Sequence, residues 1–193
     1  MQQTIAIVGD GRLGRALAAA LGTGRPHGRG YDGANADVVL LCVPDAEIAA
    51  AAAAVVPGPI VGHCSGATGL DVLAPHEALS LHPLMTVTPA GADFAGAGCA
   101  IAGTTPRALD AARALARTLG MRAVEVADED RAAYHAAASI ASNFLVTLEG
   151  AAERLAATAG VPRELLVPLA RAALDNWAAT SAEHALTGPV ARG

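Results

Sequence analysis

The feature that most constrains the fold is a glycine-rich turn near the start of the chain, Gly9-Asp10-Gly11-Arg12-Leu13-Gly14. A short β-rich apolar run (4–8) precedes it, and an alanine-rich segment (12–21) that favours a helix follows it and ends at Gly22. In such a unit the first glycine makes the tight turn, the second lets a pyrophosphate approach the backbone, and the third lets helix and strand pack closely. The helix N-terminus also attracts phosphate. The residues expected to contact a dinucleotide are Gly9, Gly11, Arg12, Leu13 and Gly14; a turn kept for packing alone is the alternative.

Strand and helix patterns alternate through the next part of the chain. Apolar runs predict further strands at 37–43, 60–63, 78–82, 98–102 and 122–126, and helices are predicted at 45–56 and 106–119. Such alternation is typical of a doubly wound, mostly parallel sheet of the Rossmann type. Beyond Asp128 only helical patterns remain, at 129–159 and 163–183. We therefore expect an α/β dinucleotide-binding domain over 1–127 and a small all-α domain over 128–193.

The usual second strand of a dinucleotide-binding domain has no counterpart here. Between the first helix and the strand that begins at Asp37, the segment 22–36 contains five glycines, Pro26 and no apolar run. A crossover to a parallel strand needs about a dozen residues by itself, so a strand, a helix and their loops do not fit. Because the lost pieces belong at the edge of the sheet, the strands on either side of the gap can still pair. Asp32 is a candidate for the missing ribose-binding acid, and Arg25 and Arg29 for binding a 2'-phosphate, which favours NADP over NAD; solvated loop residues are the alternative for each.

Composition narrows the class of function. The 193-residue chain is 53% hydrophobic, which is enough for a substantial core, and it carries a formal charge of -5. It has no basic run and few aromatic residues, so we expect no nucleic-acid partner. Its apolar stretches are short or interrupted, which predicts neither a membrane segment nor a secretion signal. The three widely spaced cysteines (Cys42, Cys64 and Cys99) form no disulfide or CxxC framework, and a reducing cytoplasm fits them best.

Several strings along the chain together resemble one bacterial protein family. They are VGDGRLGRAL, VVLLCVPDAEI, GHCSGATGL, SLHPLMTV, YHAAASIASNF and ALTGPVARG. The chain resembles proteins with a Rossmann-like and a DUF2520 domain, which are relatives of the 6-phosphogluconate dehydrogenase, β-hydroxyacid dehydrogenase and pyrroline-5-carboxylate reductase group. The resemblance implies an NAD(P)-dependent oxidoreductase whose helical C-terminal domain forms a homodimer. The chain departs from the pattern in its missing second strand and in stopping at Gly193, where such proteins usually continue, so we expect a truncated helical domain.

The resemblance also implies where a nicotinamide ring would lie. It would pass the ends of two strands, and the expected walls are Val43-Pro44 and Ser65-Gly66. Ser65 and its neighbouring N–H groups could hold a substrate carboxylate or the ring carboxamide, whereas an N-cap before a helix at 67–73 is the structural alternative. His82 could face the same cleft or be a hydrogen-bonded core residue.

A second set of candidates lies in the predicted helix 129–159. His135, Ser139 and Asn143 recur at i, i+4 and i+8, so on an α-helix they share one face. The related β-hydroxyacid dehydrogenases carry a lysine four residues before an asparagine; Asn143 matches the asparagine, and Ser139 replaces the lysine. Because histidine titrates near neutrality, His135 is the expected general acid, with Tyr134 a weaker candidate.

Three other sites have less support. A zinc site from His63, Cys64, His82 and His135 lacks the local spacing of zinc ligands, and we predict no metal. Cys64 as a nucleophile activated by His63 is disfavoured because neighbouring strand residues point to opposite faces. A set near the end of the chain could bind phosphate or end a helix: Thr187, Gly188, Pro189 and Arg192.

Two functions remain open. The first is an NAD(P)-linked oxidoreductase acting on a small oxo, hydroxy or imino acid, with His135, Ser139, Asn143 and Ser65 in the catalytic site. The second is a non-catalytic binding or regulatory protein on a Rossmann core that has lost its adenosine-side strand.

Overall fold

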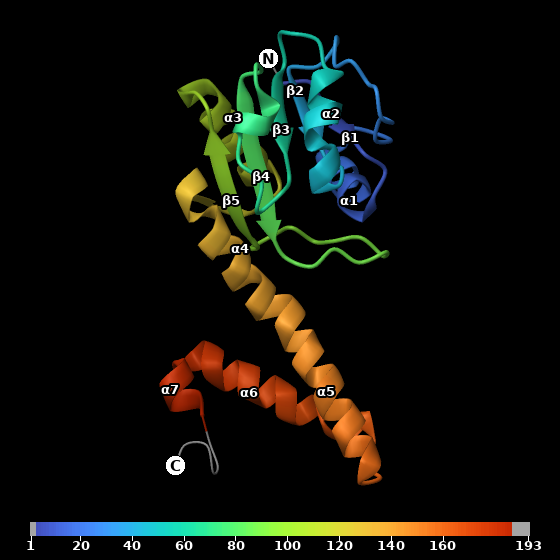
Figure 1. Cartoon of the computed structure of the whole chain (residues 1–193), viewed down its shortest axis with the longest axis vertical. Coiled ribbons are helices and arrows are strands. Elements are labelled where there is room, and N and C mark those ends of the chain that lie inside the picture. Colours follow the sequence, from blue (N-terminus) through green and yellow to red (C-terminus); the bar gives the residue numbers. More distant parts are fainter. Residues whose placement is uncertain (1–2, 187–193) are drawn as a thin grey trace. The chain divides into compact units, whose positions relative to one another are not determined.

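A six-stranded, mostly parallel sheet forms the centre of the first part of the chain (Figure 1). The structure is a computed structural model that describes residues 3–186, and it divides into two compact units, Met1–Ala138 and Ser139–Gly193. The strands are β1 (Ile5–Val8), β2 (Val38–Leu41), β3 (Ile60–His63), β4 (Ala78–Leu84), β5 (Gly98–Gly103) and β6 (Arg122–Glu125). The helices of the first unit are α1 (Arg12–Leu21), α2 (Ile48–Ala53), α3 (Pro106–Thr118) and most of α4 (Arg131–Ser139).

The strands follow one another across the sheet in chain order, from β1 to β6. All neighbouring pairs are parallel except β4 and β5, which are antiparallel. Every residue of β2 and β3 is buried, as the uninterrupted apolar runs in the sequence predicted for strands covered on both faces. The predicted Rossmann-type α/β fold is therefore confirmed.

Helices cover both faces of the sheet. On one face Leu17 of α1 and Leu115 of α3 belong to the same buried cluster as Leu40 of β2. On the other face Ile48 and Ala52 of α2 belong to a second buried cluster. α2 follows a 3-10 turn (Asp45–Glu47) and ends at Ala53, three residues earlier than the sequence predicted. The alternative helix at 67–73 is not formed; this loop contains only a 3-10 turn at Asp71–Leu73.

The gap after α1 is filled by a loop with one strand-like residue. Between Leu21 and Val38, where the structure describes every residue, no strand forms, as the glycine-rich sequence predicted. His27 alone makes a parallel bridge to Val8: its N–H donates to the Ile7 carbonyl at 2.7 Å, and its carbonyl accepts from Gly9 N–H at 2.9 Å. β1 and β2 pair directly, with Ile7 opposite Leu40.

The second unit contains helices and short connecting turns in its described residues, and no strand. After the end of α4 come a π-helical turn (Ile140–Phe144), α5 (Leu145–Thr158), a 3-10 turn (Arg163–Leu165), α6 (Val167–Ala179) and α7 (Ala182–Ala185). Among residues 139–186 none is buried. The predicted all-α C-terminal part is thus confirmed, and in the described part of the chain no helix is both long and apolar enough to span a membrane.

Candidate functional site

A cavity of about 410 Å³ lies where α1 begins and where β2 and β3 end. Its walls contain six of the residues predicted to bind a cofactor: Gly11, Arg12, Leu13, Val43, Pro44 and Ser65. Cys42, Asp45, Cys64 and Val87 complete the walls. Parallel strands bring their carboxyl ends to one edge of a sheet, which is why segments far apart in the sequence meet at this cavity.

The three glycines of the turn differ in their surroundings. Gly9 has φ +111°, and a Cβ there would lie 2.4 Å from the Cys42 carbonyl oxygen. A Cβ on Gly14 would lie 1.9 Å from the Gly9 carbonyl oxygen. Gly9 and Gly14 are therefore required by packing and stand outside the cavity wall, whereas a Cβ on Gly11 would meet nothing within 4 Å.

This arrangement fits a phosphate group. Gly11 is the N-cap of the ten-residue helix α1, and the first N–H groups of a helix have no partners within it. The open space at Gly11 lies in the cavity wall beside these groups. An anion of phosphate size can therefore approach the positive end of the helix dipole without a side chain in between.

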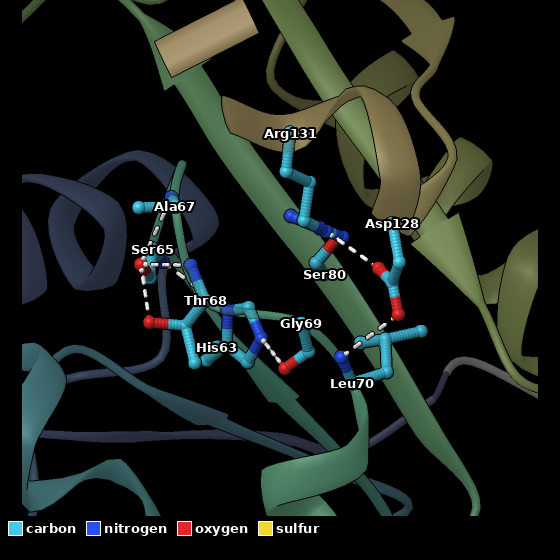
Figure 2. A network of polar contacts seen from close by, with 9 residues as sticks. All are labelled: His63, Ser65, Ala67, Thr68, Gly69, Leu70, Ser80, Asp128 and Arg131. Carbon is cyan, nitrogen blue, oxygen red and sulfur yellow. Dashed lines mark hydrogen bonds and ion pairs between the residues drawn. The ribbon is translucent and has the colours of Figure 1, made fainter. Parts of the chain in front are cut away.

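Ser65 organises the loop after β3. Its hydroxyl donates to Asp45 Oδ2 at 2.8 Å. The same oxygen accepts from the N–H groups of Ala67 and Thr68 at 3.2 and 3.0 Å (Figure 2). The side chain is 7% exposed. The alternative of a helix N-cap is wrong because no α-helix follows, but the hydroxyl does fix the shape of the cavity wall and ties it to the loop after β2.

Behind this loop lies a second polar network that sequence reasoning missed. Arg131, which is 3% exposed, donates from Nε to Asp128 Oδ1 and from Nη2 to Ser80 Oγ, each at 2.6 Å (Figure 2). Asp128 also accepts from Leu70 N–H at 3.4 Å. The hydrogen bond from Arg131 lowers the pKa of Asp128, so the pair stays charged. The network joins the start of α4 to the loop after β3.

His63, at the end of β3, is fully buried in the same region. Its Nδ1 accepts from Ser65 N–H at 3.2 Å, so its Nε2, 3.1 Å from the Gly69 carbonyl oxygen, is the nitrogen that donates (Figure 2). Burial lowers its pKa, which keeps the ring neutral. Both ring nitrogens are thus committed to the loop, and His63 is a structural residue.

The residue after Ser65 contacts two other histidines. A Cβ on Gly66 would lie 2.8 Å from His82 Cε1 and 2.9 Å from His135 Nδ1, so only glycine fits between the two rings. His82 Nδ1 is hydrogen-bonded to the Tyr134 hydroxyl at 2.7 Å, and the rings of His82 and His135 are 6.4 Å apart. Burial raises the pKa of Tyr134 to about 12. The sequence candidates His82, Tyr134 and His135 therefore form one cluster beside the cavity wall.

His82 should make stability depend on pH. Burial first, and then the nearby His135 and Arg131, lower its pKa from 6.5 to about 4, so the folded state binds its proton less readily than the unfolded chain. The contribution of neutral His82 to the free energy of unfolding is fully present above pH 6.5. It is lost as the pH falls to 4, by up to about 3 kcal/mol. Urea unfolding across this range should show a steeper loss for the wild type than for His82→Gln. If the free energies of unfolding of the two proteins fell in parallel with pH, His82 would not be the source of the pH dependence. The lowered pKa of His63 acts in the same direction, but His63 is present in both proteins, so its effect cancels in the comparison.

The remaining catalytic candidates belong to the second unit. Ser139 is the last residue of α4, and Asn143 lies in the π-helical turn, where Thr147 Oγ1 donates to its carbonyl at 2.9 Å. The predicted helix is therefore not α-helical throughout, because the π turn at Ile140–Phe144 interrupts it and holds more residues than an α turn. Such turns are frequent at functional sites.

The loop that replaces the second strand carries two arginines near the glycine turn. Arg25 Nη2 lies 3.7 Å from Asp10 Oδ2, and Arg29 Nη2 lies 2.9 Å from Glu47 Oε2. Both guanidinium groups are largely exposed, so these ion pairs are weak and exchangeable. Asp32 is different: its Oδ1 accepts from Ala34 N–H, and its carbonyl accepts from Val56 N–H before β3, which places it away from the turn.

The weaker candidates gain no support. Among residues 3–186 no group of three or more His, Cys, Asp or Glu side chains could hold a metal ion. Thr187, Gly188, Pro189 and Arg192 lie outside the described residues. A second cavity, of about 480 Å³, includes Asp71, His76, Thr104 and Asp128 in its walls and contains none of the predicted site residues.

Two family profiles match the sequence. The profile of a Rossmann-like domain matches residues 31–89, and that of DUF2520, a domain of unknown function, matches residues 97–193, just over half of the chain. The second match begins before β5, whereas the sequence-based boundary was placed after residue 127 and the compact units divide after Ala138. A search of curated proteins finds no match.

Solved structures share the fold over nearly the whole chain. A Bacteroides fragilis protein with a provisional assignment as an NADP oxidoreductase is 20% identical, with a TM-score of 0.82 over 99% of this chain and 86% of that one. A Thermotoga maritima protein is 26% identical, with a TM-score of 0.82 over 98% and 84%. Plasmodium falciparum pyrroline carboxylate reductase, solved with NADP bound, is 9% identical, with a TM-score of 0.70 over 98% and 86%.

Proposed function

The chain belongs to the DUF2520 family, and from this premise we propose that it is an NAD(P)-dependent oxidoreductase acting on a small oxo, hydroxy or imino acid. The observation that carries the proposal is the cavity in which the N-terminus of α1 meets the loops after β2 and β3. A bound nicotinamide dinucleotide would supply or accept the hydride. The fold of NADP-bound pyrroline carboxylate reductase supports the same class of cofactor.

Different residues of the first unit bind the cofactor and transfer the proton. The N–H groups at the start of α1 hold the phosphates, and Gly11 leaves the space for them. Val43 and Pro44 form one wall, and Ser65 holds the opposite loop in place through Asp45. His135, which faces Gly66 beside this loop, donates the proton to the substrate oxygen or nitrogen. For Ser139 and Asn143 we keep the substrate-orienting role that the family resemblance implies.

Arg25 and Arg29 favour NADP over NAD. They flank His27 on the loop that takes the place of the second strand, and their exposed guanidinium groups exchange weak carboxylate partners for a 2'-phosphate. The choice between NADP and NAD therefore depends on a loop in this protein, whereas in the usual fold it depends on a residue near the end of the second strand.

Titration of the purified protein with NADPH and NADH, by thermal shift and nicotinamide fluorescence, tests the proposal. NADPH should bind, and Arg25→Ala with Arg29→Ala should weaken it about tenfold, or about 1.4 kcal/mol, while NADH binding stays unchanged. Arg107→Ala, an exposed arginine paired with Glu77, is the matched control. A protein that responds to neither nucleotide would refute the oxidoreductase; one that binds NADPH without turning over any oxo or imino acid would be the regulatory alternative.

We also propose that the helices of the second unit mediate homodimerisation. Large apolar side chains on α5 and α6 are exposed in the single chain, including Leu148 (68%), Leu155 (73%) and Trp177 (56%). A monomer rarely exposes so much apolar surface. Sedimentation at micromolar concentration should give a dimer, and Leu148→Glu combined with Leu155→Glu should give a monomer. A monomeric wild type would contradict the proposal.

A further inference from the structure

Two cysteines face each other at the ends of neighbouring strands. Cys42 follows the last residue of β2, Cys64 follows the last residue of β3, and those last residues, Leu41 and His63, are opposite each other in the parallel register. The two Sγ atoms are 3.8 Å apart. Adjacent strands lie about 4.8 Å apart, within the range of Cα separations of about 4.4–6.8 Å that disulfides span. A bond therefore needs the sulfur atoms to approach by less than about 2 Å.

Both thiols belong to the wall of the cavity, but they are not equally accessible. Cys42 is partly exposed, whereas Cys64 is 8% exposed. The hydrogen bond with Cys42 and burial raise the pKa of Cys64, so this group remains a thiol. The third cysteine, Cys99, is fully buried in β5, and its Sγ donates to the adjacent Ala100 carbonyl. Cys42 is thus the thiol that a solute in the cavity meets first.

We propose that Cys42 and Cys64 are a reversible dithiol–disulfide pair that hydrogen peroxide oxidises and that weakens dinucleotide binding when the disulfide forms. Cys42 sulfur attacks one peroxide oxygen, which gives a sulfenic acid and releases the other oxygen as water. Cys64 sulfur then attacks Cys42 sulfur and forms the S–S bond, while its thiol proton passes to the departing hydroxyl, which leaves as a second water. The two thiols lose two electrons and two protons in total, and these reduce one hydrogen peroxide to two waters.

The disulfide would act on the glycine turn through Cys42. The Cys42 carbonyl oxygen lies where a Gly9 side chain would be, and its Cβ lies 3.3 Å from the Cβ position of Gly14. Cys42 N–H also donates to the carbonyl of Val8, the residue before Gly9, at 2.7 Å. Because β2 lies between β1 and β3, a shift of Cys42 toward Cys64 pulls on this hydrogen bond and so changes the turn that begins α1. The formation of the bond stands on the cysteine geometry alone, and its effect on the cofactor rests on the proposed function.

The bond is tested by treating the reduced full-length protein with hydrogen peroxide and mapping the peptides by mass. We expect a pair of peptides linked through Cys42 and Cys64, with a combined mass that is lower by two hydrogens. Dithiothreitol should separate the two peptides and restore their original masses. Cys99→Ala should behave as the wild type, and neither Cys42→Ser nor Cys64→Ser should form an intramolecular disulfide. Peroxide treatment that yields only sulfinic or sulfonic acid at Cys42, or disulfides between chains, would overturn the proposal.

The coupling is tested by titrating reduced and oxidised protein with NADPH. Oxidation should weaken binding about tenfold in the wild type and in Cys99→Ala, and dithiothreitol should restore it. In Cys42→Ser, which lacks the thiol that reacts first, the affinity should be the same before and after peroxide. An oxidised wild type of unchanged affinity would overturn the regulatory role. If reduced protein binds no nucleotide, the proposed function fails, and the peptide map still decides whether the dithiol pair exists.

Discussion

Gly14→Ala should destabilise the protein by about 3 kcal/mol or more. A Cβ at this position would lie 1.9 Å from the Gly9 carbonyl oxygen and 3.3 Å from Cys42 Cβ. The nearest clash is with backbone, which cannot rotate away as a long side chain does. Urea denaturation followed by circular dichroism measures the effect, and a variant whose free energy of unfolding stays within 1 kcal/mol of the wild type would contradict it.

Gly11→Ala, three residues earlier, is the matched control. A Cβ there meets nothing within 4 Å and the backbone has negative φ, so the free energy of unfolding should change by less than about 0.5 kcal/mol. Its methyl group enters the cavity, however, and should weaken NADPH binding. The two variants together distinguish two roles of glycine in this motif: Gly14 permits packing, and Gly11 leaves room for the ligand.

His135→Gln should lower kcat by about 100-fold or more, because it removes the proposed proton donor while keeping a side chain of similar reach. NADPH affinity should change little, since His135 is absent from the wall of the cofactor cavity. Turnover is measured as NADPH oxidation with 1-pyrroline-5-carboxylate and with small 2-oxo acids.

The control for this substitution is His184→Gln, because His184 is exposed and bonds only to Ser181 among its described contacts. It should retain full activity. A His135→Gln variant with the kcat of the wild type would remove His135 as the acid. Asn143→Ala should instead raise KM more than it lowers kcat, as expected of a residue that orients the substrate.

The fold was largely predictable because its signals are local. Gly9, Gly11 and Gly14 identify the first strand–turn–helix unit, and uninterrupted apolar runs such as 38–41 identify strands buried on both faces. The missing strand followed from chain length alone, since segment 22–36 is too short for a crossover. The π turn at Ile140–Phe144 was not predictable, because its residues also suit an α-helix.

The candidate site was predictable only in part. The residues of the glycine turn and of the loops after β2 and β3 meet at one cavity because parallel strands end at the same edge. Three contacts had no signal in the sequence: the ion pair of the buried Arg131 with Asp128, the bond from Ser65 to Asp45 and the approach of Cys42 to Cys64. These contacts depend on side-chain directions, and most join residues 20 or more positions apart.

The loss of the second strand also alters the order in which the sheet can assemble. In the usual doubly wound sheet, the chain adds strands on one side of the first strand and then returns past it to build the other side. Here each strand lies beside its predecessor in the chain, from β1 to β6. Every new strand therefore finds its partner already synthesised and recently placed, so the loops to be closed stay short. Such a sheet is suited to growing in one direction as the nascent chain emerges.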